Sequence, residues 1–119
     1  MHLEIITHKP KTDSGLTPLL FVHGGCHGAW CWENFLPYFA MHGYEAHAVS
    51  LRGHGASAGR ERIRSIRVPE YVADVERAAG LLSSPPVLIG HSLGGYVVQQ
   101  YGRGRVVRFK IFLDNIAAQ

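Results

Sequence analysis

Apolar segments of strand length alternate along this chain with segments whose apolar residues recur at helical spacing. The runs at 19–22 (Leu-Leu-Phe-Val) and 87–89 (Val-Leu-Ile) are unbroken, which is typical of strands buried on both faces of a sheet. We expect the first of them in the middle of the sheet. Further strands are predicted at 45–51 and 110–114, and the short run at 3–8 fits an edge strand.

Three helices are predicted between these strands. The first covers 32–41, with Gly43 placed for a left-handed cap. The second begins near Pro69, a residue favoured in the first helical turn, and ends at the Ser-Ser-Pro-Pro segment 83–86. The third covers 93–102. The apolar faces of the first two helices comprise Trp32, Phe35, Leu36, Phe39, Tyr71, Val72, Val75, Ala78, Ala79 and Leu82.

The repeated order of strand, loop and helix places the chain in the α/β class, with a mostly parallel sheet flanked by helices. No internal repeat or linker divides its 119 residues, so we expect a single domain over 1–119. Hydrophobic residues make up 46% of the chain and charged residues 18%, which is the composition of an ordinary globular domain.

The formal charge of +3 reflects a mild excess of basic residues. Neither a nucleic-acid-binding module nor exposed aromatic residues accompany them, so we expect solvated loop and helix ends and no nucleic-acid partner. Most of the basic residues fall in two clusters: Arg52, Arg60, Arg62, Arg64 and Arg67, then Arg103, Arg105, Arg108 and Lys110.

The N-terminal segment 1–8 lacks a basic region followed by a long apolar stretch, which argues against a secretory signal. No apolar run approaches the roughly 20 residues that span a bilayer, so no membrane span is expected. Cys26 and Cys31 are the only cysteines. We therefore expect a reduced, cytoplasmic setting with both thiols free.

The segment Gly90-His91-Ser92-Leu93-Gly94 matches the pattern G-x-S-x-G and lies between a predicted strand and a predicted helix. In that context the serine occupies a strained turn, where side chains two positions before and after it would collide with the backbone. Ser92 would then present its hydroxyl at the carboxyl end of the sheet, beside a helix N-terminus that favours negative charge. We predict that Ser92 is a catalytic nucleophile.

Acyl transfer places negative charge on a carbonyl oxygen, and each backbone N–H group aimed at that oxygen typically contributes about 3 to 4 kcal/mol. One donor is expected at Leu93, the residue after the nucleophile. The other is expected in the loop after the strand that ends at Val22, where His-Gly-Gly gives an accessible backbone. We choose Gly25, with Cys26 as the alternative.

Three motifs now stand in order: HGG at 23–25, LRGHG at 51–55 and GHSLGG at 90–95. In order and spacing they resemble those of α/β-hydrolases, and the resemblance extends over nearly the whole chain. The stretch 25–32 is also similar to the corresponding loop of esterases and hydroxynitrile-lyase-like members, while LRGHG is more similar to bacterial lysophospholipases and esterases. The resemblance implies a serine hydrolase that acts on small carboxylic esters.

Four residues in this region have side chains that can bind zinc: His23, Cys26, His27 and Cys31. They straddle a Gly-Gly turn, where helical spacing cannot be assumed, so we expect no metal site. No cofactor is expected either, because the glycines lack the G-x-G-x-x-G spacing of dinucleotide-binding loops. We expect structural roles for His54 and His91. Trp30 is a candidate for lining the substrate pocket, with packing as its alternative role.

A serine hydroxyl needs a base within hydrogen-bonding reach, and in α/β-hydrolases the triad follows the order serine, acid, histidine. No histidine follows Ser92. Asp114 stands at the end of the next predicted strand and is a candidate acid, although most relatives would use a later one. The resemblance therefore covers only the N-terminal part of the family's domain, without its C-terminal strands, and we expect a truncated α/β-hydrolase fold.

Two hypotheses follow. In the first, the chain belongs to a serine esterase whose base comes from sequence outside 1–119 or from a partner chain. In the second, it is a catalytically incomplete fragment with at most a binding or interaction role. The apolar strand at 110–114 would then form a sheet edge that favours self-association.

Overall fold

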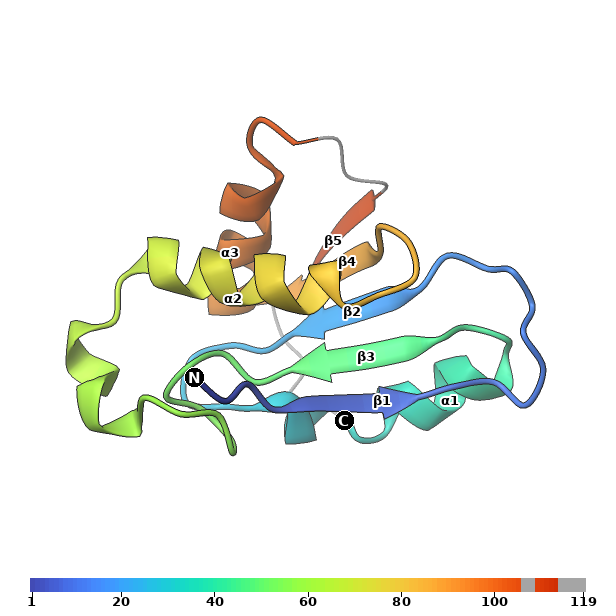
Figure 1. The fold of residues 1–119 in the computed structure, drawn as a ribbon, viewed down its shortest axis with the longest axis horizontal. Coiled ribbons are helices and arrows are strands. Elements are labelled where there is room, and N and C mark those ends of the chain that lie inside the picture. The colour runs from blue at the N-terminus through green and yellow to red at the C-terminus, as the bar shows by residue number, and fades with distance from the viewer. Residues whose placement is uncertain (106–108, 114–119) are drawn as a thin grey trace.

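The computed structural model describes residues 1–105 and 109–113 as a five-stranded sheet with helices on both faces (Figure 1). One neighbouring pair of strands, β1 with β3, is antiparallel, and the other three pairs are parallel. The mostly parallel sheet and its central apolar strand are therefore confirmed. Across the sheet the strands are β1 (Ile5–His8), β3 (Ala46–Val49), β2 (Leu19–Val22), β4 (Val87–His91) and β5 (Phe109–Leu113).

The helices divide between the two faces of the sheet, with α2 and α3 on one side and α1 on the other (Figure 1). The prediction for 93–102 agrees with α3 at both ends. Two short 3-10 helices, η1 and η2, precede α1 and α2. The helical elements are η1 (Ala29–Trp32), α1 (Phe35–Met41), η2 (Arg60–Ser65), α2 (Val68–Gly80) and α3 (Leu93–Gly102).

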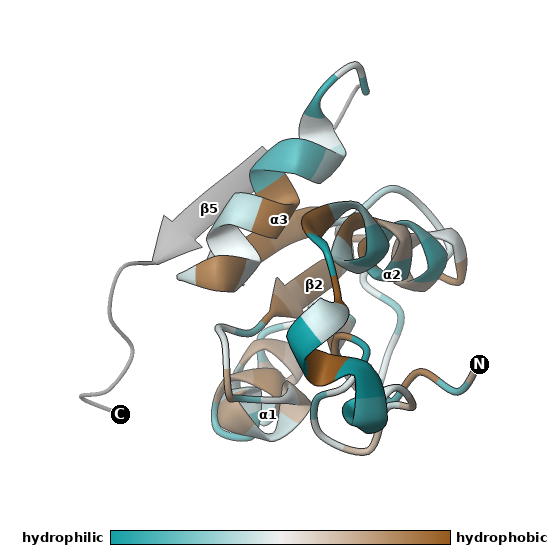
Figure 2. Cartoon of the chain, turned by 90° about the vertical axis from the view of Figure 1, so that its left-hand side faces the viewer, coloured by the Kyte–Doolittle hydropathy of each residue, from teal (hydrophilic) through white to brown (hydrophobic). Residues whose placement is uncertain are grey.

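Strand β2 supplies side chains to both hydrophobic cores, which explains its unbroken apolar sequence. Leu20 and Val22 pack into the core beneath α2 and α3. Leu19 and Phe21 point to the opposite face and pack with α1 and η1. Figure 2 shows the hydrophobic β2 between the two helical layers. All four residues of the strand are buried, so it forms the centre of the fold.

The helix predicted over 32–41 is interrupted in the structure, and α1 begins only at Phe35. Trp32 instead ends η1, where it is fully buried, with its ring centroid 4.8 Å from that of Phe21. The apolar spacing identified residues that pack in this core, with Phe35 and Phe39 only partly buried, but a 3-10 turn followed by an α-helix produces the same spacing. Gly43 adopts a φ of 94° after α1, as its predicted capping role requires.

The arginine-rich stretch after residue 59 folds into η2, which the sequence pattern did not predict and which buries none of its residues. Arg52 departs from the expectation of a solvated cation. Its guanidinium and backbone N–H both bind the Asp74 carboxylate, with Nη2 2.8 Å from Oδ1. Only 1% of the Asp74 side chain is exposed. This ion pair fixes the loop after β3 to the middle of α2.

The carboxyl ends of β2, β3 and β4 point to the same end of the molecule, which Figure 2 presents to the viewer. The loops that follow β2 and β3 meet there. A Cβ on Gly28 would lie 3.1 Å from the Cα of Gly55, so these loops pass in direct contact. The turn at Ser92 follows β4 at the same end. In the part of the chain that the structure describes, no helix combines the length and apolarity that crossing a membrane requires.

Candidate active site

Ser92 occupies the sharp turn between β4 and α3, and it has the backbone angles φ 54° and ψ −116°. A positive φ is costly for a residue with a side chain, by about 1 to 3 kcal/mol. The turn leaves Ser92 exposed, although the residue before it and the first glycines of α3 are buried. The structure therefore places a strained serine at the accessible end of the sheet.

The glycines on either side of Ser92 allow the strand and the helix to approach each other. A Cβ on Gly90 would lie 2.5 Å from the carbonyl oxygen of Gly94, and a Cβ on Gly94 would lie 2.5 Å from the carbonyl oxygen of His23. Both contacts are with backbone atoms, which cannot rotate away. The collisions predicted for side chains at positions 90 and 94 are thus present in the structure.

The loop after β2, residues 23–28 and here called the glycine loop, packs against this turn. A Cβ on Gly24 would lie 3.0 Å from Nδ1 of His91 and 3.3 Å from Cβ of Ser92. A Cβ on Gly25 would be 4.0 Å from Cδ2 of Leu93. The two residues expected to donate N–H groups to an oxyanion, Gly25 and Leu93, are therefore neighbours beside the serine.

The His23 side chain anchors the glycine loop from below. It is fully buried, its Nδ1 lies 2.7 Å from the carbonyl oxygen of Gly24, and its Nε2 lies 2.9 Å from the backbone nitrogen of Leu51. A carbonyl only accepts and an amide N–H only donates, so Nδ1 carries the proton and Nε2 has none. Burial lowers the pKa of His23 from 6.5 to about 4, which keeps the ring neutral.

This hydrogen bond also orients the peptide group between Gly24 and Gly25. No peptide bond among the described residues is cis, so the Gly25 N–H points opposite to the Gly24 carbonyl. The carbonyl faces the buried His23 ring, and the Gly25 N–H therefore points away from that ring. Sequence reasoning did not identify this role for His23. The only available signal was the position of His23 directly after a buried strand.

A second network holds the neighbouring loops around Ser50, another residue that the sequence did not single out. The Ser50 hydroxyl accepts a hydrogen bond from the Ala29 N–H at 2.8 Å and donates to Oε1 of Glu4 at 2.7 Å. Glu4 also accepts from the Ala56 N–H, and this hydrogen bond is the main reason that the pKa of its carboxyl is lowered. The N-terminal segment thus ties η1 to the loop after β3.

His54 and His91 both have fixed positions near the site. Nδ1 of His54 donates to the carbonyl oxygen of Arg52 at 3.0 Å, so His54 holds its own loop, as expected. His91 is buried beside Gly24, and its Nδ1 has no hydrogen-bond partner among the described residues. Its ring lies 6.0 Å from that of His27, measured between centroids.

The remaining candidates fall in different places. Trp30 is 52% exposed and lines a cavity beside the glycine loop. Asp114 lies outside the described residues. Within residues 1–105 and 109–113, no three histidine, cysteine or acidic side chains are grouped as a metal site would require.

Comparison with known proteins decides the family. A protein-family model described as "Alpha/beta hydrolase family" matches residues 19–116 of this chain. The chain belongs to the α/β-hydrolase family. This confirms the resemblance drawn from the three motifs.

The similar curated proteins of this α/β-hydrolase chain include plant esterases. Methylesterase 1 of Arabidopsis thaliana is 40% identical over 82 residues, which cover 64% of this chain and 30% of that protein. An esterase of Oryza sativa subsp. japonica is 35% identical over 111 residues, covering 90% of this chain and 38% of that protein. The chain therefore spans about a third of the length of these relatives.

Solved structures agree on the fold. A probable hydrolytic enzyme from Pseudomonas aeruginosa superposes on this α/β-hydrolase chain with a TM-score of 0.82 and is 23% identical to it. The match covers 98% of this chain and 38% of the Pseudomonas aeruginosa chain. An epoxide hydrolase from an endophytic Streptomyces gives a TM-score of 0.78 at 26% identity and covers 94% of this chain and 33% of its own. The α/β-hydrolase fold is confirmed, and the chain covers about a third of each of these structures.

Proposed function

We propose that this chain carries the nucleophile and the oxyanion donors of a serine hydrolase that cleaves small carboxylic esters. The observation that carries the proposal is the strained, exposed Ser92, with the glycine loop packed against its Cβ. A residue that kept only a structural role would gain nothing from a positive φ at this position. The esterase names of the similar plant proteins support the ester substrate class.

In this mechanism the Ser92 hydroxyl adds to the ester carbonyl and the carbonyl oxygen becomes an oxyanion. The N–H groups of Gly25 and Leu93 stabilise that oxyanion, and the N-terminal end of α3 adds a favourable field. Collapse of the intermediate releases the alcohol and leaves an acyl group on Ser92, which water then removes as the acid. A general base, supplied by sequence outside 1–119 or by a partner chain, takes the proton from the Ser92 hydroxyl and returns it to the departing alcohol. Asp114 as the triad acid stays a prediction.

Active-site labelling tests the nucleophile. The folded chain is treated with a fluorophosphonate, and the modified residue is located by mass spectrometry of its peptides. We expect the label on Ser92, its loss in Ser92→Ala, and no change in Ser65→Ala, because Ser65 is an exposed serine on η2. Because the proposed base lies outside 1–119, the rate of labelling at Ser92 is compared with that at the exposed Ser65, and a folded preparation in which Ser92 takes up label no faster than Ser65 would contradict the proposal.

The second candidate function is interaction without catalysis. Strand β5 pairs with β4 on one side, and within the described residues no strand pairs with its other side. Such an edge can add the strand of another molecule. We propose self-association through β5 under this alternative, measured by sedimentation at increasing concentration. Ser92→Ala should leave this association unchanged, whereas an ester-cleaving activity that disappears in Ser92→Ala favours the esterase.

A cytoplasmic location completes the proposal. It is supported by the two free cysteines, Cys26 and Cys31, which a reducing compartment maintains in that state. Alkylation of both thiols in freshly prepared protein, without prior reduction, is the expected result. A disulfide between them would argue for an oxidising compartment instead.

A further inference from the structure

A cavity of about 320 Å³ lies between the glycine loop and η2. This volume falls at the lower end of the range that small-molecule sites occupy, about 300 to 1,000 Å³. The cavity is lined by Cys26, His27, Trp30, Gly53, His54, Gly55, Arg60 and Ile63. Since Cys26 directly follows Gly25, the cavity adjoins one of the two proposed oxyanion donors.

We propose that this cavity binds an organic carboxylate with an apolar body. In the esterase it would select esters that carry a second, anionic group, and that use of the site rests on the proposed function. Binding of the carboxylate itself does not depend on Ser92. The argument comes from the charge, the apolar walls and the rigid floor of the cavity.

The charge comes from Arg60. Its Nη2 donates to the carbonyl oxygen of Gly55 at 3.1 Å, and no carboxylate in the described part of the chain binds it. The nearby Arg52 and Arg62 differ, because each forms an ion pair with Glu70. No aspartate or glutamate lines the cavity. Arg60 therefore retains several N–H donors, in a planar arrangement that matches the two oxygens of a carboxylate.

The apolar walls are the side chains of Trp30 and Ile63, which line the same cavity as Arg60. Trp30 is 52% exposed and Ile63 is 39% exposed, although both are large hydrophobic residues that favour burial. The Trp30 ring also packs beside His27, with 5.6 Å between the ring centroids. An apolar ligand body placed between these residues would remove their surface from water.

The floor of the cavity is rigid because His54 is 7% exposed and packed between two other rings. Its ring centroid is 4.9 Å from that of His23 and 5.9 Å from that of Tyr71. Nδ1 is held by the Arg52 carbonyl, and Nε2 makes no hydrogen bond within the described residues. That nitrogen is therefore left for a polar atom of the ligand. A preformed floor lowers the entropy lost on binding.

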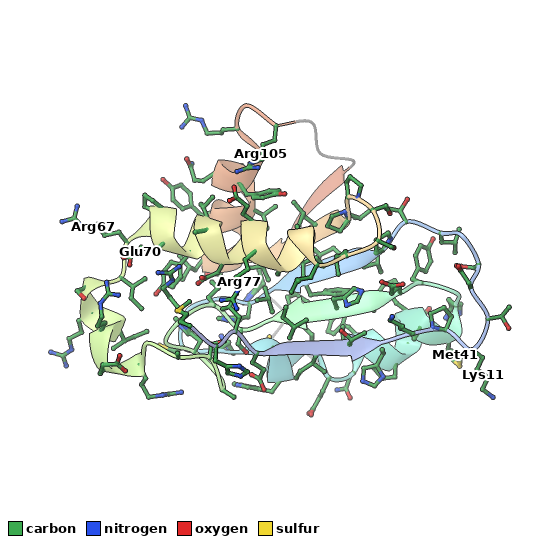
Figure 3. All side chains as sticks on the ribbon, viewed as in Figure 1. Lys11, Met41, Arg67, Glu70, Arg77 and Arg105 are labelled. Atoms are coloured by element: carbon green, nitrogen blue, oxygen red, sulfur yellow. The ribbon has the colours of Figure 1, made fainter. Side chains whose placement is uncertain are left out.

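A larger cavity of about 610 Å³ does not compete for this role. It is formed by the loop after β1 and the end of α1. Figure 3 labels Lys11 and Met41, which line it, at the opposite end of the molecule from Arg67 and Glu70 at the start of α2. It contains no residue of the candidate active site.

The chain offers its own reporter for binding. Of its two tryptophans, Trp32 is fully buried and Trp30 lines the cavity. The folded chain is titrated with 3-phenylpropionate and, separately, with the neutral 3-phenylpropan-1-ol, while tryptophan fluorescence is recorded. We expect a saturable change with the acid, much weaker binding of the alcohol, and loss of the signal in Trp30→Phe.

Two arginine variants locate the anion. Arg60→Gln should weaken binding of the acid about 10- to 100-fold, the range for losing hydrogen bonds to a charged group. Arg64→Gln is the matched control, because Arg64 belongs to the same exposed η2 but does not line the cavity, and its affinity should be unchanged. Circular dichroism of each variant verifies folding. Equal binding of acid and alcohol, or an unchanged affinity in Arg60→Gln, would overturn the proposal.

Ser92→Ala separates this inference from the proposed function. Binding of 3-phenylpropionate should persist in that variant. Saturable binding of the acid in a chain whose Ser92 takes up no fluorophosphonate would contradict the proposed esterase activity and support the carboxylate site. Labelling of Ser92 without saturable binding of the acid would contradict the carboxylate site and support the proposed esterase activity.

Discussion

The backbone N–H of Leu51 donates a hydrogen bond to Nε2 of His23 at 2.9 Å. This contact joins the loop after β3 to the glycine loop and requires an unprotonated Nε2, while Nδ1 on the same ring holds the Gly24 carbonyl. A proton added to Nε2 would turn the acceptor into a donor that faces another donor. The anchor of the glycine loop is therefore sensitive to pH.

We predict that acid destabilises the fold through His23. Burial lowers the pKa of this ring from 6.5 to about 4. Above the ordinary value both folded and unfolded chains hold a neutral ring, and this contribution to stability is complete. As the pH falls from 6.5 to about 4 only the unfolded chain takes up the proton, so about 3 kcal/mol is lost across this window. Urea unfolding at a series of pH values measures the loss.

The comparison with His23→Gln separates the contribution of His23 to the pH dependence of stability from the contributions of other acidic and basic groups. The variant should be less stable than the natural chain near neutral pH, and the difference should shrink toward about pH 4 because the variant lacks the titrating ring. His42→Gln, at an exposed histidine after α1, should follow the natural chain throughout. A pH dependence that is identical in the natural chain and His23→Gln would contradict the assignment.

The sequence was sufficient to predict the surroundings of Ser92, because each feature there has a local cause. The glycines at 90 and 94 mark a turn that needs close backbone approach, and the apolar run before them marks a buried strand. The anchoring roles of His23 and Ser50 were not predictable in this way. They depend on hydrogen bonds to Leu51 and Glu4, which the fold brings near from distant positions.

Substitution at Gly94 should damage the fold in a way that substitution at Gly80 does not. An alanine Cβ at position 94 would meet the carbonyl oxygens of Val22 and His23, so the strand or the helix must shift. We expect Gly94→Ala to lower the free energy of unfolding by about 1 to 3 kcal/mol or more and to reduce labelling of Ser92. Chemical denaturation and fluorophosphonate uptake check the two effects.

Gly80→Ala is the control for that experiment. Gly80 lies at the end of α2, with no atom within 4 Å of an added Cβ. Alanine favours the helix by up to about 1 kcal/mol relative to glycine, so this variant should be as stable as the natural chain or slightly more stable. Equal losses at positions 80 and 94 would mean that the close approach is not what position 94 requires.

The ion pair between Arg52 and Asp74 should contribute far more than the one between Arg105 and Glu76. Asp74 is 1% exposed and binds both the guanidinium and the backbone of Arg52, and its hydrogen bonds with the guanidinium raise the pKa of Arg52. Asp74→Ala removes these hydrogen bonds and leaves the Arg52 guanidinium only its longer contact with Glu70 at 3.3 Å, at a cost of about 1.5 to 3 kcal/mol. Glu76→Ala removes an exposed pair and should cost about 0 to 1 kcal/mol. Thermal unfolding of both variants gives the comparison, and similar losses would contradict it.

Arg52 also illustrates where composition misleads. It stands in an arginine-rich sequence, and four of the five residues in that cluster are exposed or on the surface helix η2. Neither charge nor apolar periodicity separates Arg52 from the others, and the LRGHG motif that contains it does not identify its partner. The difference arises because α2 places Asp74 beneath it, and no periodicity in the sequence encodes that pairing. Element positions were predictable from local spacing, whereas the partners of charged residues required the assembled sheet.

The strain at Ser92 gives the sharpest test of a functional origin for this turn. With a φ of 54°, a glycine at position 92 should be more stable than an alanine there, by about 1 kcal/mol or more, because only glycine adopts positive φ without steric cost. Comparing Ser92→Gly with Ser92→Ala removes the hydroxyl from both proteins and leaves the backbone term. At Ala73, an exposed position within α2, the order should reverse, and Ala73→Gly should lose up to about 1 kcal/mol of stability.

If alanine proves the more stable residue at position 92 as well, the turn is unstrained in solution and its shape gives no support to a nucleophile. If glycine is the more stable residue and its variant no longer takes up fluorophosphonate, the chain maintains a destabilising serine where the proposed chemistry needs one.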